Sequence, residues 1–316
     1  EVVVVGGQLS GLLAGAVLAK RGFRVLVIDH DALPPTYAVN DITLPRSPFM
    51  FTASHSPMAR RLLSELALHP VFRHRAALVD PAFQLVVPGH RVDVTGENDR
   101  WTAEIQREFP DYVNAIAEID DRARLASDTL DRLFEARLTW PPDSFFERRA
   151  FKQHTLPVEQ NPAFTRKLLA DIPRGHPLRA LISAPNRVSS HVDLSPTSML
   201  TESRHYVAWR HGTARMDGGY AAFRRLIIEK LVAHGGEVRE HERVDRILMR
   251  RRAAVGVRMA GTADEIGADH ILAACDVNAT VDPSAAMAGV MLGALPWVRR
   301  RVTPMRCQRY TSAPDW

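Results

Sequence analysis

The residues best suited to chemistry in this sequence are the turn Gly6–Gly11 and the acid Asp29. The turn reads Gly-Gly-Gln-Leu-Ser-Gly and directly follows the apolar run Val2–Val5. A glycine-rich turn between a buried strand and a helix presents backbone N–H groups and the positive end of the helix dipole, which suit a pyrophosphate. An acid at the end of the next strand accepts hydrogen bonds from a ribose. The pattern therefore predicts a dinucleotide-binding turn.

The segments around this turn have the composition of a strand, a helix and a second strand. Val2–Val5 and Val25–Ile28 are short apolar runs, typical of strands buried on both faces in a parallel sheet. The helix between them ends at Lys20-Arg21-Gly22, with cations near the negative end of its dipole. Its packed side is formed by Leu12, Leu13, Ala16, Val17 and Ala19. We therefore expect a Rossmann-type β–α–β unit that ends in Asp29, 18 residues beyond Gly11.

Gln8 departs from the dinucleotide-binding pattern. Gly6 lets the chain turn sharply off the strand, and Gly11 lets the helix pack against the sheet. The second glycine position, where the backbone approaches the pyrophosphate most closely, is occupied by Gln8. That side chain must swing away, contact the phosphate itself, or block the site. The candidate cofactor-binding residues from this stretch are Gly6, Gly7, Gln8, Ser10, Gly11 and Asp29.

The string Val3–Leu12 resembles the opening of FAD-dependent phytoene (carotenoid) desaturases. A second match runs from Met216 through the pair Gly218-Gly219, a helix and several strand-like runs to Leu272. The glycine pair alone also fits a plain turn before a helix. The resemblance implies an FAD-binding domain in two sequence blocks, with the backbone of Val244 against the adenine. It also implies hydride transfer between flavin N5 and a long apolar substrate, an isoprenoid or another lipid.

We expect an α/β fold, with a Rossmann-type FAD-binding domain interrupted by a largely helical substrate domain that also contains strands. Residues 1–50 and 212–282 are assigned to the FAD-binding domain, and residues 51–211 and 283–316 to the substrate domain. The family's C-terminal glycine-rich motif and final helix do not follow. We therefore interpret the sequence as the ordered part of a longer protein rather than as a natively truncated one.

A rival hypothesis is a non-catalytic scaffold or assembly protein that keeps a flavoprotein fold with a decayed cofactor site. Gln8 and the missing C-terminal motif favour it, and so does Ala32–Tyr37, which lacks the family's second glycine-rich stretch. An NAD(P)-dependent enzyme is a third hypothesis, which the resemblance of the downstream block to flavoproteins disfavours.

The middle of the chain carries several helix and hairpin signals. Ser56-Pro57 predicts a helix start, and Ala82–Val94 predicts a hairpin around a Pro-Gly turn. Pro110-Asp111 opens a long helix whose apolar positions from Tyr112 to Leu133 alternate four and three residues apart. Such a seam packs on its own domain or forms a coiled-coil contact with another subunit. Residues 139–200 are consistent with short helices and loops over a cavity.

Metal and triad chemistry find little support in the sequence. The segment Trp209–His211 either faces a flavin or substrate, or forms a structural strand. No Ser–His–Asp or Cys–His arrangement is evident, which is compatible with chemistry done by a flavin. Solvated or core positions, rather than metal ligation, are expected for His154, His176, His191, His205 and His211.

Composition limits the remaining possibilities. The chain has 316 residues, 46% of them hydrophobic, so it can bury a sizeable core in about two domains. Two cysteines exclude a disulfide framework and indicate a reducing, cytoplasmic compartment. The net charge of +5 is modest, and nothing resembles a nucleic-acid module.

The longest apolar run, Ala285–Leu295, is too short to cross a bilayer, since a spanning helix needs about 20 residues. Trp297 and the run Arg299–Arg301 follow it. This segment is either a core helix ending in a basic turn or a surface that contacts anionic lipid.

Overall fold

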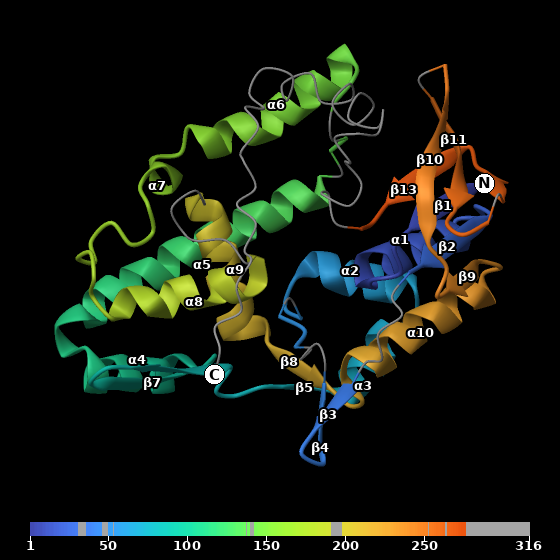
Figure 1. Ribbon diagram of the computed structural model, residues 1–316. Helices are drawn as coiled ribbons and strands as arrows, with labels where there is room; N and C mark the ends of the chain where they lie inside the picture. Colours follow the sequence, from blue (N-terminus) through green and yellow to red (C-terminus); the bar gives the residue numbers. More distant parts are fainter. Residues whose placement is uncertain are drawn as a thin grey trace, which may run out of the picture.

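The computed structural model describes residues 1–30, 36–45, 50–52, 54–136, 138–139, 142–190, 198–251, 253–262 and 264–275. The expectations for His191, Ala285–Leu295 and Arg299–Arg301 lie outside these residues. Figure 1 shows a sheet with its covering helices on one side of the molecule and a larger group of helices on the other. The predicted mixed α/β fold is confirmed.

A four-stranded parallel sheet forms the Rossmann-type region. Its order is β13-β1-β2-β9, and all of its pairings are parallel. Val4 of β1 lies between Val27 of β2 and Leu272 of β13, so the sheet joins the start of the chain to a distant segment. The strands are β1 (Val2–Val5), β2 (Val25–Asp29), β9 (Glu237–Glu240) and β13 (His270–Ala273).

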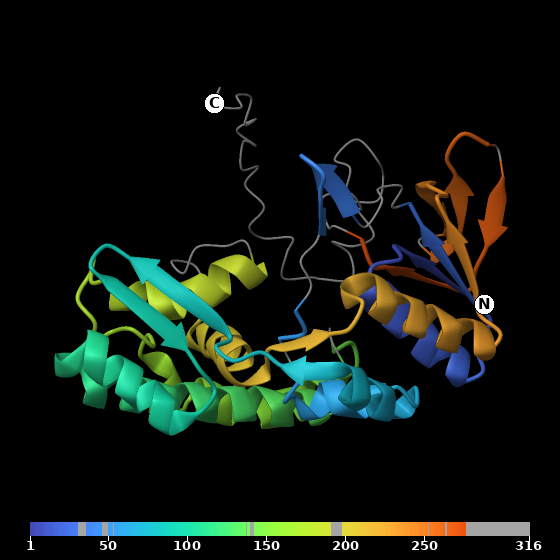
Figure 2. The ribbon, with the colours of Figure 1, turned by 90° about the horizontal axis from the view of Figure 1, so that it is seen from below.

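Two helices pack side by side on one face of this sheet, α1 (Leu9–Lys20) and α10 (Gly219–Ala233) (Figures 1 and 2). Gly15 allows the close approach, because an added Cβ there would lie 3.0 Å from Val27 and 3.1 Å from Leu231. The same core includes Leu63 and Phe72, from α2 (Pro57–Glu65) and α3 (His69–Arg75).

An antiparallel sheet covers the other face of the parallel sheet. Val257 and Met259 from this sheet pack with Val3 and Ile28. Its strands are β10 (Val244–Arg250), β11 (Ala253–Met259) and β12 (Glu265–Gly267). These three strands, with β9 and β13 of the parallel sheet, account for the strand-like runs before Leu272.

A second core lies in the helical region, where α5 (Val113–Glu135) packs against α9 (Met199–Gly212) and α8 (Leu178–Ser190) packs on α9. Two ion pairs link α5 and α9: Asp131 to Arg204 at 2.9 Å and Asp120 to Arg210 at 2.7 Å. The seam of α5 is buried in this core through Ile116, Ile119, Ala123 and Ala126. Of the two alternatives for this seam, packing on its own domain or a coiled-coil contact with another subunit, the first describes these four positions.

The structure corrects two details that were expected in this region, the short length of the helices in residues 139–200 and the strand alternative for Trp209–His211. Residues 139–200 contain regular helices of 15 and 13 residues, α6 (Phe145–Glu159) and α8, although each includes a proline. The segment Trp209–His211 is the end of α9 and not a strand. α6 has no buried residue and begins with a capping box of Ser144 and Glu147, a local signal, whereas α9 packs on α5 and α8. Ser56 does precede α2, but its hydroxyl donates to Asp131 instead of capping the helix.

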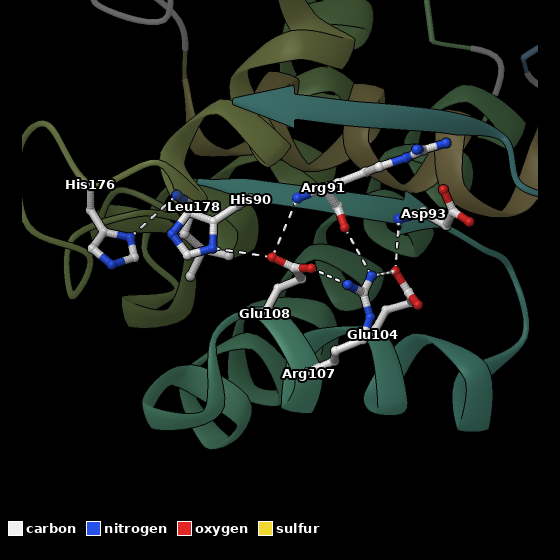
Figure 3. Close-up of polar contacts among 8 residues, drawn as sticks. All are labelled: His90, Arg91, Asp93, Glu104, Arg107, Glu108, His176 and Leu178. Atoms are coloured by element: carbon white, nitrogen blue, oxygen red, sulfur yellow. Dashed lines mark hydrogen bonds and ion pairs between the residues drawn. The ribbon is translucent and has the colours of Figure 1, made fainter. Parts of the chain in front are cut away.

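The predicted hairpin is formed by β6 (Phe83–Val87) and β7 (His90–Val94), and α4 (Asn98–Glu108) holds it in place (Figure 3). Glu104 accepts a hydrogen bond from the backbone of Asp93 at 2.9 Å, and Glu108 contacts the His90 ring at 3.2 Å. His176 accepts from the backbone of Leu178, at the start of α8. His90 and His176 therefore have structural contacts.

The shorter elements complete the described chain. A hairpin joins β3 to β4, β5 pairs with β8, and η1 leads into α5. Their bounds are β3 (Thr36–Val39), β4 (Ile42–Pro45), β5 (Ala76–Leu78), η1 (Pro110–Tyr112), α7 (Pro162–Thr165) and β8 (Ala214–Met216). No helix among the described residues is long and apolar enough to span a membrane.

Candidate functional site

The turn after β1 is built from glycines that leave no space for side chains. Gly6 has a φ of 113°, and its N–H donates to the Ile28 carbonyl at 2.9 Å. An added Cβ at Gly11 would lie 2.1 Å from the Gly6 oxygen. At Gly7 it would lie 2.4 Å from the Asp29 side chain. Each glycine is therefore required where the turn, the helix and the acid meet.

The N-terminus of α1 presents backbone donors beside this turn. Its first intrahelical bond runs from Leu12 N to Gln8 O at 3.0 Å, so the N–H groups of Leu9, Ser10 and Gly11 come before it. Ser10 is exposed, and the first turn has no acidic residue to offset the helix dipole. These features favour an anion at this position.

Asp29 ends β2 directly below the turn and is only 5% exposed. One carboxylate oxygen accepts from the Gly7 N–H at 3.3 Å, and the other is 2.7 Å from an Arg224 nitrogen. Arg224 also contacts Glu240 at 2.6 Å. Burial acts to lower the pKa of Arg224, but the bonds and charges of Glu240 and Asp29 outweigh it and raise that pKa. A carboxylate with a fixed orientation thus adjoins the anion-binding turn.

The Gln8 side chain is bonded to α10 and does not cap its own helix. Its Oε1 accepts a hydrogen bond from the Tyr220 hydroxyl at 2.7 Å. Its backbone has a φ of −70° and a ψ of 170°, an extended conformation that any residue adopts. Gln8 therefore occupies the second glycine position without backbone strain.

Val244 is the first residue of β10, where it pairs with Met259 and is half-buried. Two residues earlier, the Glu242 N–H donates to the Asp29 carbonyl at 3.1 Å. The chain that enters β10 therefore runs beside the end of β2. The structure brings most of the expected site residues together at the turn: Gly6, Gly7, Gln8, Ser10, Gly11 and Asp29. Val244 lies at the start of β10, on the segment that runs beside the end of β2.

Two residues of this site were not found from the sequence, Tyr220 and Arg224. They lie four residues apart on α10 and thus on one helix face. Each contacts a fingerprint residue, Gln8 or Asp29. The sequence feature that could have indicated them is their four-residue spacing in the helix that begins at the pair Gly218-Gly219.

A second polar cluster lies between α2, α5 and α9. Arg204 donates to both oxygens of Asp131 and to the hydroxyls of Ser56 and Ser127. Among the described residues, neither ring nitrogen of the adjacent His55 has a hydrogen-bond partner. Burial and the charge of Arg204 lower the pKa of His55.

His211 lies close to this cluster. Burial and the neighbouring Arg210 and Arg124 lower its pKa to about 4. The part of the chain that the structure describes contains no group of three His, Cys, Asp or Glu side chains able to hold a metal.

A pocket of about 290 Å³ lies away from the turn, between α2, α3, β5 and β8. Its lining includes Arg60, Phe72 and Ala214, and no fingerprint residue contributes to it. The pocket is therefore separate from the candidate dinucleotide site.

Comparison with known families agrees with the geometry of the turn. Residues 4–66 match the model of the NAD(P)-binding Rossmann-like domain. The parallel sheet to which these residues contribute β1 and β2 is Rossmann-like. Over 44 residues the chain is 43% identical to tetracycline 7-halogenase from Kitasatospora aureofaciens, a match that covers 14% of this chain and 8% of that protein.

Two solved structures share the fold. An oxidoreductase from Methanosarcina mazei aligns with a TM-score of 0.56 and 15% identity, over 95% of this chain and 65% of that one. Cyclohexylamine oxidase from Brevibacterium oxydans aligns with a TM-score of 0.52 and 17% identity, over 93% of this chain and 62% of that one. The chain thus has a fold found in solved oxidoreductases and spans less than two thirds of their length.

Proposed function

We propose that this protein is an FAD-dependent oxidoreductase. The observation that carries the proposal is the contact between the Gly7 N–H and the Asp29 carboxylate at the N-terminus of α1. The proposal takes the first turn of α1 as the pyrophosphate-binding group and Asp29 as the ribose-binding acid, and this contact supports it because one dinucleotide requires the two side by side. The fold shared with solved oxidoreductases supports it.

The residues at the turn fit such a cofactor. The N–H groups of the first turn of α1 would bind the pyrophosphate, and Asp29 would accept hydrogen bonds from the ribose. The backbone at Val244 would contact the adenine. Bound FAD would supply the hydride-accepting chemistry. The residues of this chain bind and orient it, which agrees with the lack of a nucleophilic triad in the sequence.

For the substrate we propose a long apolar molecule, an isoprenoid or another lipid, as in the phytoene desaturases. The support is the resemblance of Val3–Leu12 and of the block from Met216 to Leu272. Because such a substrate dissolves in lipid, Arg299–Arg301 are proposed to contact an anionic membrane surface. Replacing these arginines with Glu should then release the protein from anionic vesicles, and wild-type protein that fails to float with vesicles at low salt would exclude the contact.

The test of the proposed function is the cofactor content of the purified protein. We expect a flavin absorption spectrum, and we expect the flavin released on denaturation to be FAD. Protein purified without flavin should regain it from added FAD. A colourless protein that binds neither FAD nor ADP would support the scaffold hypothesis, and one that binds NADPH but not FAD would support an NAD(P)-dependent enzyme.

A further inference from the structure

Tyr220 and Arg224 of α10 contact two residues of the dinucleotide pattern, Gln8 and Asp29. Tyr220 bonds to Gln8 at 2.7 Å, and Arg224 bonds to Asp29 at 2.7 Å. Gly218 and Gly219, with φ values of 77° and 58°, lead the chain from β8 into α10. The first turn of α10 is thereby set against the first turn of α1.

The Gln8 side chain, at the second glycine position, can compete with a cofactor. A glutamine amide at the start of a helix has an oxygen that can accept from the N–H groups of the first turn. Those are the groups that a pyrophosphate would use. In the structure this oxygen accepts from Tyr220, and no bond from the Gln8 side chain to the N-terminus of α1 is formed.

We propose that Tyr220 is a positioning residue that holds Gln8 away from the pyrophosphate site and so allows this chain to bind a dinucleotide without the second glycine. The proposal rests on the proposed function, because it concerns the same turn. It explains how Gln8 is accommodated at a position where the pattern calls for glycine. In this proposal α10 contributes to cofactor binding indirectly, through the bond of the Tyr220 hydroxyl to Gln8.

A double-mutant cycle distinguishes this role from the alternatives. FAD and ADP affinities are measured for wild type, Tyr220→Phe, Gln8→Gly and the double variant. Loss of the hydroxyl removes the bond that holds the Gln8 oxygen on α10, so Tyr220→Phe should weaken FAD binding by about 5- to 10-fold. In the Gln8→Gly background the same change should alter affinity by less than about twofold. Tyr112→Phe, in η1 of the helical region, is the matched control and should bind as wild type does.

Equal losses in both backgrounds would show that Tyr220 acts on the cofactor or on the fold directly, and would overturn the proposal. No loss from Tyr220→Phe, with wild type binding FAD normally, would overturn it as well and leave the proposed function standing. Failure of all four proteins to bind FAD or ADP would contradict the proposed function and this inference together. A second readout uses protein labelled with ¹⁵N-glutamine and free of FAD, in which Tyr220→Phe should shift the Gln8 side-chain amide signal. An unchanged signal would contradict the contact itself.

Discussion

Arg224 of α10 forms an ion pair with Asp29 of β2, with 2.7 Å between Nη2 and Oδ2. The two residues come from separate sequence blocks and meet beneath the turn that follows β1. The Asp29 side chain is 7% exposed, so its orientation depends on the groups that contact it. The pair therefore links the stability of the Rossmann-like region to the geometry of its candidate ribose site.

Replacing Arg224 with Leu should destabilise the protein, because the buried Asp29 carboxylate loses a charged partner. We expect the free energy of unfolding, measured in urea, to fall by about 1–3 kcal/mol. Glu240→Gln is the control: it removes the other contact of Arg224, but the Glu240 side chain is 49% exposed, so the loss should stay below about 1 kcal/mol. Equal losses from the two variants would show that the contact with Asp29 has no special importance.

Gly11→Ala should disrupt the turn, since the new Cβ would lie 2.1 Å from the backbone oxygen of Gly6. A backbone oxygen cannot move aside cheaply, so we expect a loss of at least about 1–3 kcal/mol in urea unfolding. Gly267→Ala is the matched control, because the nearest atom to its Cβ would be 4.0 Å away. If both variants unfold at the same urea concentration, the close packing described for the turn is incorrect.

The histidines near α9 should make stability depend on pH. Burial lowers the pKa of His211 to about 4, and burial together with Arg204 lowers those of His55 and His205 below 6.5. The folded protein therefore binds fewer protons than the unfolded chain between pH 6.5 and about 4. This contribution to stability is complete above pH 6.5 and is lost as the pH falls through that range.

His211→Gln should reduce this pH dependence. The slope of unfolding free energy against pH should decrease by at most about 1.4 kcal/mol per pH unit, the value for one proton. This slope is measured by urea unfolding of the wild-type and variant proteins at several pH values. Their difference in unfolding free energy at pH 8, where imidazole is neutral, is the reference. Parallel curves from pH 8 to pH 4.5 would contradict the low pKa.

The Rossmann-like unit was predictable because its determinants are local. Val2–Val5, the glycines of the turn and Asp29 lie within one short stretch, and each has its expected place in the structure. The contacts of Tyr220 and Arg224 were not predictable, because they join helix faces to residues about 200 positions away in sequence. Nothing in a single sequence gives the rotation of α10 relative to α1.

Residues outside the turn also show that local sequence signals do not predict tertiary contacts. Ser56 has the sequence signature of a helix cap, yet its hydroxyl belongs to the buried cluster of Asp131 and Arg204. Pro157 and Pro185 argue locally against helices, but α6 and α8 continue through them. For Ser56 and for α8, which buries Leu178 and Leu181, tertiary contacts outweigh a local preference of a few kcal/mol at most. α6 has no buried residue and begins with a capping box instead.

The affinity for FAD of the wild-type protein beside that of Asp29→Ala decides whether the turn is a dinucleotide site. Removing the carboxylate should weaken FAD binding by about 1–3 kcal/mol, roughly 5- to 150-fold, because the ribose hydroxyls lose their acceptor. Asp29→Asn, which keeps the shape of the side chain, should show a smaller loss in the same titration, and circular dichroism should show all three proteins folded. Folded Asp29→Ala protein that binds FAD as tightly as wild type would contradict the assignment of the site.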